Sequence, residues 1–274
     1  MKLKKLIAVA LTAVMTMSLT ACGGGNTTGT TSGGAVDDGK TYNIGICQLV
    51  QHEALDAATK GFKDALTKKL GDKVKFDEQN AQGDSPTCAT IVNSFVSENV
   101  DLILANATAP LQAAATGTTD IPILGTSVTD YGTALNIKDW KGTTGVNVSG
   151  TSDLAPLDQQ AAMIKELFPD KKKVGLLYCS AEANSLYQVE TIKGYLEKDG
   201  YTCTNYSFVD SNDIASVVSN AAKNSDVIYV PTDNTAASNT EVIRNTCVPA
   251  KVPVVAGEQG ICNGCGVATL SISY

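Results

Sequence analysis

The chain has few of the side chains on which catalytic and metal-binding sites are most often built. It contains one histidine, His52, and one tryptophan, Trp140, and aromatic residues make up only 5% of its 274 residues. A Ser-His-Asp or Cys-His site would have to use His52, and a metal receptor needs several convergent His, Asp or Cys ligands. Neither a Gly-x-Ser-x-Gly elbow nor a Walker-type phosphate loop is present. These absences argue against an enzyme and against a resident metal or cofactor.

Positive charge is also scarce, because 21 Lys and Arg stand against 28 Asp and Glu and give a net charge of −7. Without residues 1–21, which hold three lysines, the net charge is about −10. Binding to nucleic acid depends on Lys and Arg that neutralise phosphates, so we expect no nucleic-acid partner. A strongly acidic body is unsurprising for a protein that faces extracellular solvent.

One long apolar run is present, and it lies at the N-terminus. Lys2, Lys4 and Lys5 precede a stretch of apolar and small residues from 6 to 19. The stretch has about 14 residues, too few to span the ~30 Å hydrocarbon core of a bilayer comfortably. This pattern is typical of a secretory signal peptide, which we predict over residues 1–21.

Cys22 directly follows Leu19-Thr20-Ala21, an order that resembles the lipobox of bacterial lipoproteins. In those proteins the thiol receives a diacylglycerol and the chain is cut before the cysteine. The resemblance implies that Cys22 is the lipidation site. It also implies an extracytoplasmic protein anchored to the bacterial cell membrane by its acyl chains. An ordinary signal peptide followed by a chance cysteine is the alternative.

The next segment, residues 22–40, is rich in Gly, Thr, Ser, Asn and Asp and has almost no apolar side chains. Such a segment cannot bury enough surface to offset its ordering entropy, so we predict a flexible linker. The folded part is expected over residues 41–274, a length natural for two domains of ordinary size.

Short apolar runs alternate with helical patterns through this folded part. Strands are expected first at 42–47, 74–76, 101–105 and 121–125, and helices at 54–70, 85–96 and 110–115. After a crossing strand at 144–148, strands are expected at 173–178, 201–208, 226–230, 252–256 and 267–272, and helices at 153–168, 186–196, 214–222 and 235–246. The βαβ period predicts an α/β fold of two doubly wound parallel-sheet lobes, over 41–148 and 149–274.

Polar side chains directly after the strands are the candidate site residues, because ligands of such sheets bind beyond the carboxyl ends of the strands. Their hydroxyl, amide and carboxylate groups suit a zwitterion or a polyol. The alternative for each residue is that it caps the following helix. The set is Gln48, Gln51, His52, Asn106, Thr108, Thr126, Ser127, Asp130, Ser180, Glu182, Asn184, Ser185, Thr232, Asp233, Asn234 and Glu258.

Seven cysteines follow Cys22, an odd number that cannot pair completely within the chain. Cys47 and Cys179 lie in or at the end of strand-like runs, where cysteine often serves as a small buried hydrophobe. Cys262-Asn-Gly-Cys265 has C-x-x-C spacing, for which we favour local packing or a local disulfide. A zinc site would need a second pair or a nearby histidine, and a redox pair would follow an early strand.

In these residues and their order, the chain resembles bacterial ABC-transporter substrate-binding lipoproteins. More narrowly, it is similar to the family that includes receptors for tryptophan and other aromatic amino acids. The order and spacing of several stretches carry the resemblance over most of residues 42–272. These stretches are 46–56, 61–62, 79–84, 101–109, 121–130, 144–153, 178–185, 231–235 and 256–258.

The resemblance implies a type I periplasmic-binding fold whose lobes close on the ligand by hinge motion. It implies delivery of a small ligand, an amino acid and in particular an aromatic one, to the permease subunits of an ABC importer. The acids Glu182, Asp233 and Glu258 would bind the ammonium group of the ligand. Hydroxyls and backbone N–H groups near Thr108 and Ser127 would bind its carboxylate. Carried over by position, the ligand-binding residues are Gln48, His52, Thr108, Ser127, Glu182, Asn184, Ser185, Asp233, Asn234 and Glu258.

Two departures from the family are visible. Ala54 stands where the family usually has proline, and family members continue past the equivalent of residues 271–274 to complete the first lobe. We therefore expect the chain to be a fragment of a longer receptor, truncated at its C-terminus.

Three other functions stay open. A sugar or nucleoside receptor of the same fold would stack its ligand on aromatic rings such as Tyr131, Tyr178 or Tyr187. A ligand-sensing surface lipoprotein is a second possibility, although no second apolar run of ~20 residues exists to pass a signal inward. Paired acids such as Glu182 and Asp233 suit acid–base catalysis as well as ammonium binding.

Overall fold

The computed structural model describes residues 39–274. The predicted signal peptide, the lipidation site Cys22 and all but the end of the predicted linker lie outside these residues. Within the described range, none of the helices has both the length and the apolar character needed to cross a membrane.

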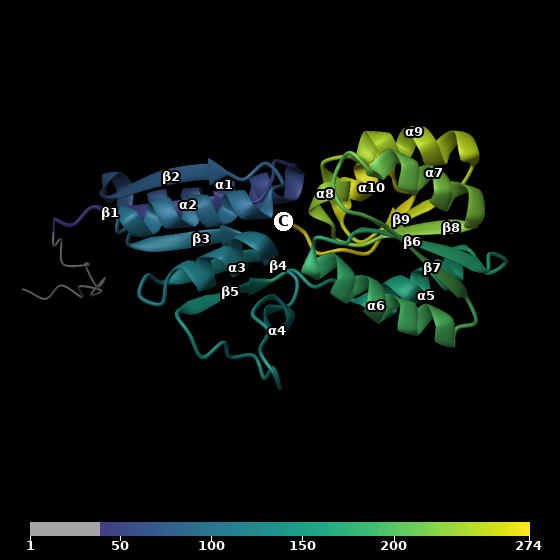
Figure 1. Ribbon diagram of the computed structural model, residues 1–274, viewed down its shortest axis with the longest axis horizontal. Helices are drawn as coiled ribbons and strands as arrows, with labels where there is room; N and C mark the ends of the chain where they lie inside the picture. The colour runs from purple at the N-terminus through teal and green to yellow at the C-terminus, as the bar shows by residue number, and fades with distance from the viewer. Residues whose placement is uncertain (1–38) are drawn as a thin grey trace, which may run out of the picture. The chain divides into compact units, whose positions relative to one another are not determined.

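The first lobe is built on a parallel sheet with strand order β2-β1-β3-β4-β5 (Figure 1). Its strands are β1 (Tyr42–Gln48), β2 (Val74–Asn80), β3 (Leu102–Asn106), β4 (Ile123–Val128) and β5 (Val148–Ser152). Its helices are α1 (Glu53–Leu70), α2 (Ser85–Ser97), α3 (Thr108–Gly117) and α4 (Tyr131–Ala134), with a 3-10 turn η1 (Gly71–Lys73). Phe62 and Leu66 of α1 pack against one face of the sheet, and α2 and α3 pack against the other.

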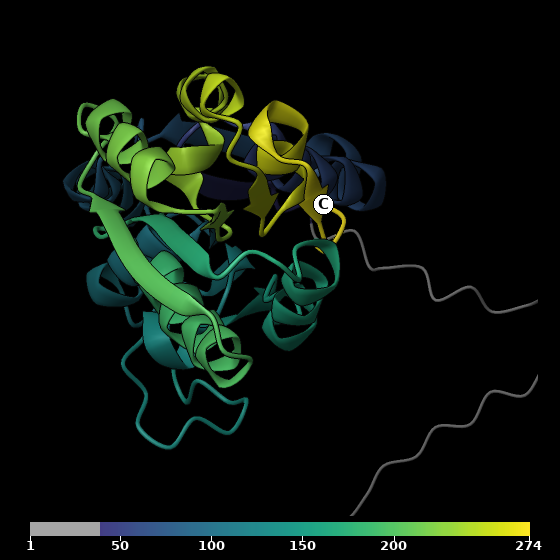
Figure 2. The same ribbon diagram turned by 90° about the vertical axis from the view of Figure 1, so that its right-hand side faces the viewer.

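The second lobe repeats this arrangement, with strand order β10-β9-β8-β6-β7. Its strands are β6 (Lys173–Cys179), β7 (Thr202–Phe208), β8 (Val227–Val230), β9 (Val254–Ala256) and β10 (Ala268–Thr269). Its helices are α5 (Leu157–Leu167), α6 (Ala183–Lys198), α7 (Ile214–Asn224), α8 (Asn234–Ala237), α9 (Thr240–Ala250) and α10 (Gln259–Cys265). Helices α5 and α6 contribute to the core on one face, and α7, α9 and α10 to the core on the other (Figure 2). The predicted two-lobed, doubly wound α/β fold is confirmed.

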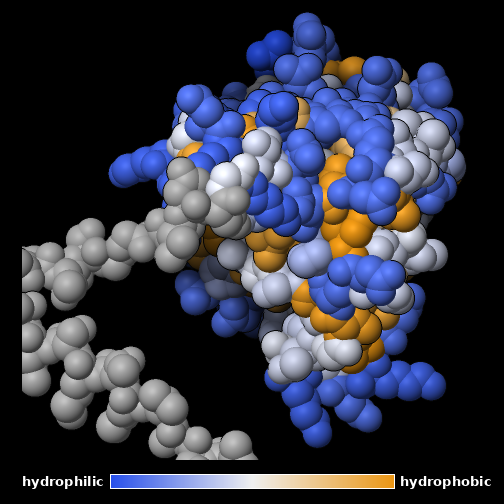
Figure 3. All heavy atoms as spheres, turned by 90° about the vertical axis from the view of Figure 1, so that its left-hand side faces the viewer, coloured by the Kyte–Doolittle hydropathy of each residue, from blue (hydrophilic) through white to orange (hydrophobic). Residues whose placement is uncertain are grey.

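Local sequence accounts for the regular elements. The carboxylate of Asp84 accepts a hydrogen bond from the Thr87 backbone N–H at 3.0 Å and so caps α2, and a proline lies in the first turn. Ile91, Val92 and Phe95 then recur on the buried face at helical spacing. On the face that Figure 3 shows, apolar side chains form patches among polar ones.

Some element boundaries differ from the predicted ones. The crossing strand is Val148–Ser152, not 144–148, so the chain leaves the first sheet after Ser152. The helix predicted over 235–246 is divided into α8 and α9. A helix not predicted, α10, lies between β9 and β10, and β10 covers only two residues of the strand predicted over 267–272.

The two predicted buried cysteines are confirmed, since Cys47 and Cys179 are 0% and 2% exposed. The Cys262-Cys265 pair lies in α10, where Cys265 is buried in the second-lobe core and Cys262 packs beside it. In the described residues all cysteines carry free thiols, and no group of three or more His, Cys, Asp or Glu is placed to hold a metal ion.

Candidate ligand-binding site

The carboxyl ends of the strands of both lobes surround a small cavity of about 10 Å³. This volume is room for about one water molecule. An amino acid is larger, so the walls of the cavity must move apart for such a ligand to enter and to stay bound. The cavity is lined by His52, Ala54, Leu55, Ser127, Thr129, Asp153, Asn184, Thr232, Asp233, Asn234, Ala237, Glu258 and Tyr274.

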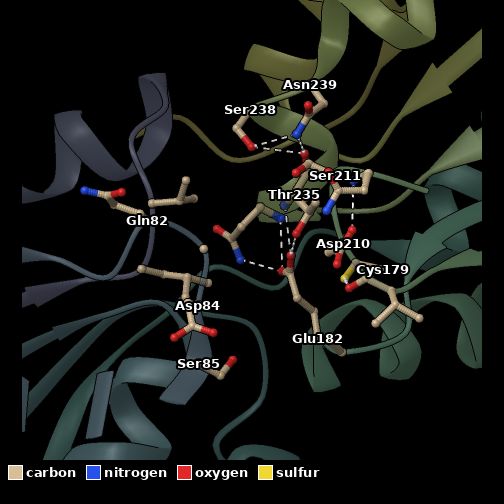
Figure 4. Close-up of a pocket in the computed structure, with 17 residues that line it drawn as sticks. Gln82, Asp84, Ser85, Cys179, Glu182, Asp210, Ser211, Thr235, Ser238 and Asn239 are labelled. Atoms are coloured by element: carbon tan, nitrogen blue, oxygen red, sulfur yellow. Dashed lines mark hydrogen bonds between the residues drawn. The ribbon is translucent and has the colours of Figure 1, made fainter. Parts of the chain in front are cut away.

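Six of the ten predicted ligand-binding residues line this cavity: His52, Ser127, Asn184, Asp233, Asn234 and Glu258. Glu182 lines an adjacent groove of about 340 Å³, in which Gln82, Asp84 and Ser85 come from the first lobe (Figure 4). The remaining three, Gln48, Thr108 and Ser185, are buried and do not line the cavity.

The buried carboxylate of Glu182 organises the start of α8. Its Oε2 accepts hydrogen bonds from the Asn234 backbone N–H at 3.0 Å, the Asn234 side-chain amide at 2.7 Å and the Asn184 amide at 3.1 Å. Its Oε1 accepts from the backbone N–H and the hydroxyl of Thr235, each at 2.8 Å (Figure 4). Glu182 thereby joins the start of α6 to the start of α8, and both of its oxygens are engaged.

The other two predicted acids also hold helix starts. Asp233 caps α8 by accepting from the Ala236 backbone N–H at 2.8 Å, and its second oxygen accepts from the Cys179 N–H at 2.6 Å. Glu258 caps α10, and its two oxygens accept from the backbone N–H groups of Gly260 and Ile261. These carboxylates line the cavity with both oxygens already accepting hydrogen bonds.

Gln48 belongs to a buried network that fixes the end of β1. Its Oε1 accepts a hydrogen bond from the Thr59 hydroxyl at 2.6 Å, and its Nε2 donates to the Asp56 carboxylate at 2.7 Å. Asn106, at the end of β3, donates to the Thr59 hydroxyl at 2.9 Å. The network locks α1 onto the ends of two neighbouring strands and so supports the first-lobe wall of the cavity.

Two lining residues of the cavity, Asp153 and Tyr274, were missed by sequence reasoning. Asp153 directly follows β5 and is 5% exposed, and its Oδ2 accepts a hydrogen bond from the Tyr274 hydroxyl. Its Oδ1 is buried and has no hydrogen-bond partner among the described residues. The signal was available, because Asp153 closes one of the stretches that carry the family resemblance and is the acid nearest to the end of the crossing strand.

Ser127 has the second unsatisfied polar atom of the cavity. Its Oγ is buried without a partner among residues 39–274. Its backbone has φ of 55°, in the left-handed region that non-glycine residues seldom adopt. Strain of this kind gathers at ligand-binding positions, where the surrounding structure holds a side chain toward the ligand.

Buried hydrogen bonds place the C-terminal segment against the cavity, and the chain end lies between the two lobes (Figure 1). The side-chain amide of Gln160, on α5, donates to the Leu270 carbonyl at 2.7 Å and to the Gly257 carbonyl at 3.3 Å. The Tyr229 hydroxyl donates to the Gln160 Oε1 at 2.6 Å. This network anchors the segment from which Tyr274 extends.

His52 joins the lobes directly. Its Nε2 lies 3.1 Å from the Oδ1 of Asn234, across the cavity from the start of α1 to the start of α8. The contact exists only while the lobes are close together, so it contributes to the stability of this arrangement of the lobes.

Burial of the cavity acids changes how the stability of the protein depends on pH. It raises the pKa values of Asp153, Glu258 and Asp233, and the charge of Glu182 raises the pKa of Asp233 further. The folded protein therefore binds protons more tightly at these groups than the unfolded chain does. This tighter proton binding stabilises the folded protein. The stabilisation is fully present below the ordinary carboxyl pKa of about 4, and it is lost as the pH rises through the raised pKa values of the folded protein.

We therefore expect the melting temperature to be higher by several degrees at about pH 5 than at about pH 8. Asp101 and Asp226, which are partly exposed, have lowered pKa values and act in the opposite sense, but solvent screens them. Thermal unfolding at about 0.05 M and about 0.5 M salt separates the causes, because salt screens surface repulsion and leaves buried acids nearly unaffected. A melting temperature that rises with pH at high salt would contradict this account.

Two α/β lobes with a polar cavity between the carboxyl ends of their strands are typical of a solute-binding receptor. The family model of ABC transporter substrate binding proteins matches residues 43–274, and the chain belongs to this family. It is thus a substrate-binding protein of an ABC transporter. Proteins of this family are extracytoplasmic receptors that bind a small molecule for ABC permeases.

Several known proteins are similar along most of the chain. A tyrosine-binding protein of Clostridioides difficile is 38% identical over all of this chain and 80% of its own length. An ABC domain from Streptococcus pneumoniae, solved in complex with L-Trp, is 35% identical with a TM-score of 0.81 and covers 85% of this chain and 80% of its own.

The arrangement of the lobes is closer to that ligand complex than to an open relative. A ligand-free, open structure of a Clostridium difficile substrate-binding protein with adhesive properties is 39% identical. The match covers 82% of this chain and 77% of that one. Its TM-score is only 0.57, despite the higher identity. The difference fits the small cavity and the contact between His52 and Asn234, which both require the lobes to lie close together.

Proposed function

We propose that this protein is an amino-acid receptor, with an aromatic amino acid as its ligand, that delivers the ligand to the permease subunits of an ABC importer. One observation carries the proposal. The cavity between the lobes presents a buried acceptor, the Asp153 Oδ1, and a buried hydroxyl, the Ser127 Oγ, which both lack partners among the described residues. An α-amino acid carries an ammonium and a carboxylate on one carbon and suits such a pair.

The relatives support the same ligand class. One relative is named a tyrosine-binding protein, and one similar structure was solved in complex with L-Trp. We propose the two predicted lobes, 41–148 and 149–274, as the two binding units, with the boundary moved to follow Ser152 because β5 belongs to the first sheet. Attachment to the membrane through a lipid on Cys22 is part of the proposal and rests on the lipobox-like sequence.

The sugar alternative is less well supported by the positions of the aromatic rings. Tyr131 and Trp140 are stacked with their centroids 6.4 Å apart, but they line a separate hollow on the first lobe. Among the residues that line the cavity between the lobes, Tyr274 has the only large aromatic ring. A sugar site would be expected to use stacking rings on the ligand, whereas this cavity is dominated by short polar groups.

A thermal-shift screen of the full chain tests the proposal. We expect L-Tyr, L-Trp or L-Phe to raise the melting temperature, because a ligand at about 100 times its Kd adds about 2.7 kcal/mol. For a folded part of this length that is a shift of about 5–10 °C. Glucose, ribose and adenosine serve as the comparison set. A shift produced by one of these neutral compounds, and by none of the amino acids, would refute the amino-acid assignment.

A further inference from the structure

The cavity holds four carboxylate-bearing side chains on or next to its wall, and they are not equivalent. Glu182, Asp233 and Glu258 each use both oxygens to accept hydrogen bonds from helix starts or from backbone N–H groups. Asp153 accepts a hydrogen bond from the Tyr274 hydroxyl at Oδ2. Burial raises the pKa of this carboxyl, and the nearby Thr129 side chain, like that of Tyr274, acts to lower it. The Asp153 Oδ1 is the one carboxylate oxygen of the cavity that is buried and unpartnered among residues 39–274.

We propose that Asp153 is the residue that binds the ligand's ammonium group, and that Tyr274 is the positioning residue that aims its carboxylate. This inference rests on the proposed amino-acid function. It assigns the ammonium to an acid that the strand-end pattern did not single out. It assigns to Glu182, Asp233 and Glu258 the task of holding the starts of α8 and α10.

The energetics of burial favour this choice. A buried acceptor without a hydrogen bond costs about 1–3 kcal/mol, and more if it is charged. An ammonium group supplies both the missing donor and the opposite charge, so it removes the cost that Asp153 bears in the unliganded cavity. At the other three acids, an ammonium would have to share oxygens that already accept from the protein, and the gain would be smaller.

The Asp153 side chain is also rigidly placed. Its backbone N–H donates to the Val128 carbonyl at 3.1 Å, and the Ser152 hydroxyl donates to the Thr129 carbonyl at 2.8 Å. These bonds fix the end of β5 beside the end of β4. The Tyr274 hydroxyl, held from the second lobe through the Gln160 network, then engages Oδ2 and leaves Oδ1 for the ligand.

Calorimetry on the full chain, with two matched ligands and two matched variants, tests the assignment of the ammonium group to Asp153 directly. The probes are L-tyrosine and 3-(4-hydroxyphenyl)propionate, which is the same molecule without the ammonium. Asp153→Asn is compared with Asp158→Asn, an equal change of charge at an exposed position on α5. We expect Asp153→Asn to weaken L-tyrosine at least about 30-fold and the propionate at most about threefold. Asp158→Asn should leave both affinities unchanged.

The outcomes separate the two claims. If the wild-type chain binds none of L-tyrosine, L-tryptophan and L-phenylalanine, the proposed function fails and this assignment fails with it. If the wild-type chain binds L-tyrosine and Asp153→Asn keeps the same preference for L-tyrosine over the propionate, only the assignment to Asp153 is overturned. L-tryptophan and its deaminated analogue, 3-indolepropionate, replace the first pair if the wild-type chain prefers tryptophan.

Tyr274→Phe tests the positioning role and also decides the matter if Asp153→Asn does not fold. Affinity for L-tyrosine should fall on acidification as Asp153 takes up a proton. Without the Tyr274 hydroxyl, that fall should begin at a higher pH. His52, Asp233 and Glu258 face the same cavity and are unchanged in the variant, so the difference between the two pH profiles isolates Asp153. Identical profiles for the wild type and Tyr274→Phe would overturn the proposal.

Discussion

Replacing Glu182 with Gln is expected to lower the free energy of unfolding by about 3 kcal/mol, one of the largest effects of any single change in this chain. The Glu182 carboxylate accepts five hydrogen bonds from Asn184, Asn234 and Thr235. Glutamine keeps the shape but has one acceptor oxygen. Its NH₂ group would face donors that belong to the start of α8, and each buried donor left unpaired costs about 1–3 kcal/mol.

Thermal and denaturant unfolding measure this effect, with Glu197→Gln as the control. Glu197 lies on the same helix, α6, and is exposed. We expect Glu197→Gln to change the free energy of unfolding by at most about 0.5 kcal/mol. The Glu182→Gln melting temperature should fall by about 6–12 °C, given the length of the folded part. A Glu182→Gln protein as stable as the control would show that the carboxylate does not hold α6 and α8 together.

The large features of the fold were predictable because they depend on periodicity. Apolar runs such as Leu102–Asn106 are buried on both faces, as strands in the centre of a parallel sheet must be, and their pattern is visible in the sequence. Helices such as α2 combine a cap, an early proline and a buried apolar face. These signals are local, so the sequence alone is enough to place them.

The elements that were misplaced depend on distant contacts. Strand β5, Val148–Ser152, exposes four of its five residues and has no apolar alternation, so only its pairing with β4 makes it a strand. Helix α10 contains two glycines and would be a poor helix alone. It forms because Glu258 caps its first turn and Ile261 and Cys265 pack in the core.

The candidate site was predictable in location and not in detail. Strand-end residues were expected to meet at a cleft, and His52, Ser127 and Asp233 do line one cavity. The sequence cannot show which carboxylate oxygens are already used, because Asp233 and Glu258 receive their hydrogen bonds from backbone groups. Whether each predicted residue contacts the ligand stays a prediction for the binding experiments.

The second large effect is expected at Gly150, in the strand that leads from the first lobe to Asp153. Gly150 has φ of +155° and pairs with Gly125 of β4. A Cβ at residue 150 would lie 2.1 Å from the Gly125 carbonyl oxygen and 2.2 Å from the Tyr131 hydroxyl. The Tyr131 hydroxyl lies within hydrogen-bond distance of the carbonyls of Gly125, at 2.9 Å, and Thr151, at 3.2 Å, so it ties β5 to β4 where the chain leaves the first lobe.

Gly150→Ala is therefore expected to lower the free energy of unfolding by about 3 kcal/mol or more, since overpacking and backbone strain each cost about 1–3 kcal/mol. Gly194→Ala, in α6, is the matched control, because a Cβ there has no atom within 4 Å and should stabilise the helix by up to about 1 kcal/mol.

Tyr131→Phe should not rescue Gly150→Ala, since the clash with the Gly125 carbonyl would persist. The displaced end of β5 would also move Asp153, so any folded Gly150→Ala protein should bind an amino acid at least about tenfold more weakly. Unfolding curves and calorimetry that place Gly150→Ala beside Gly194→Ala would contradict both expectations.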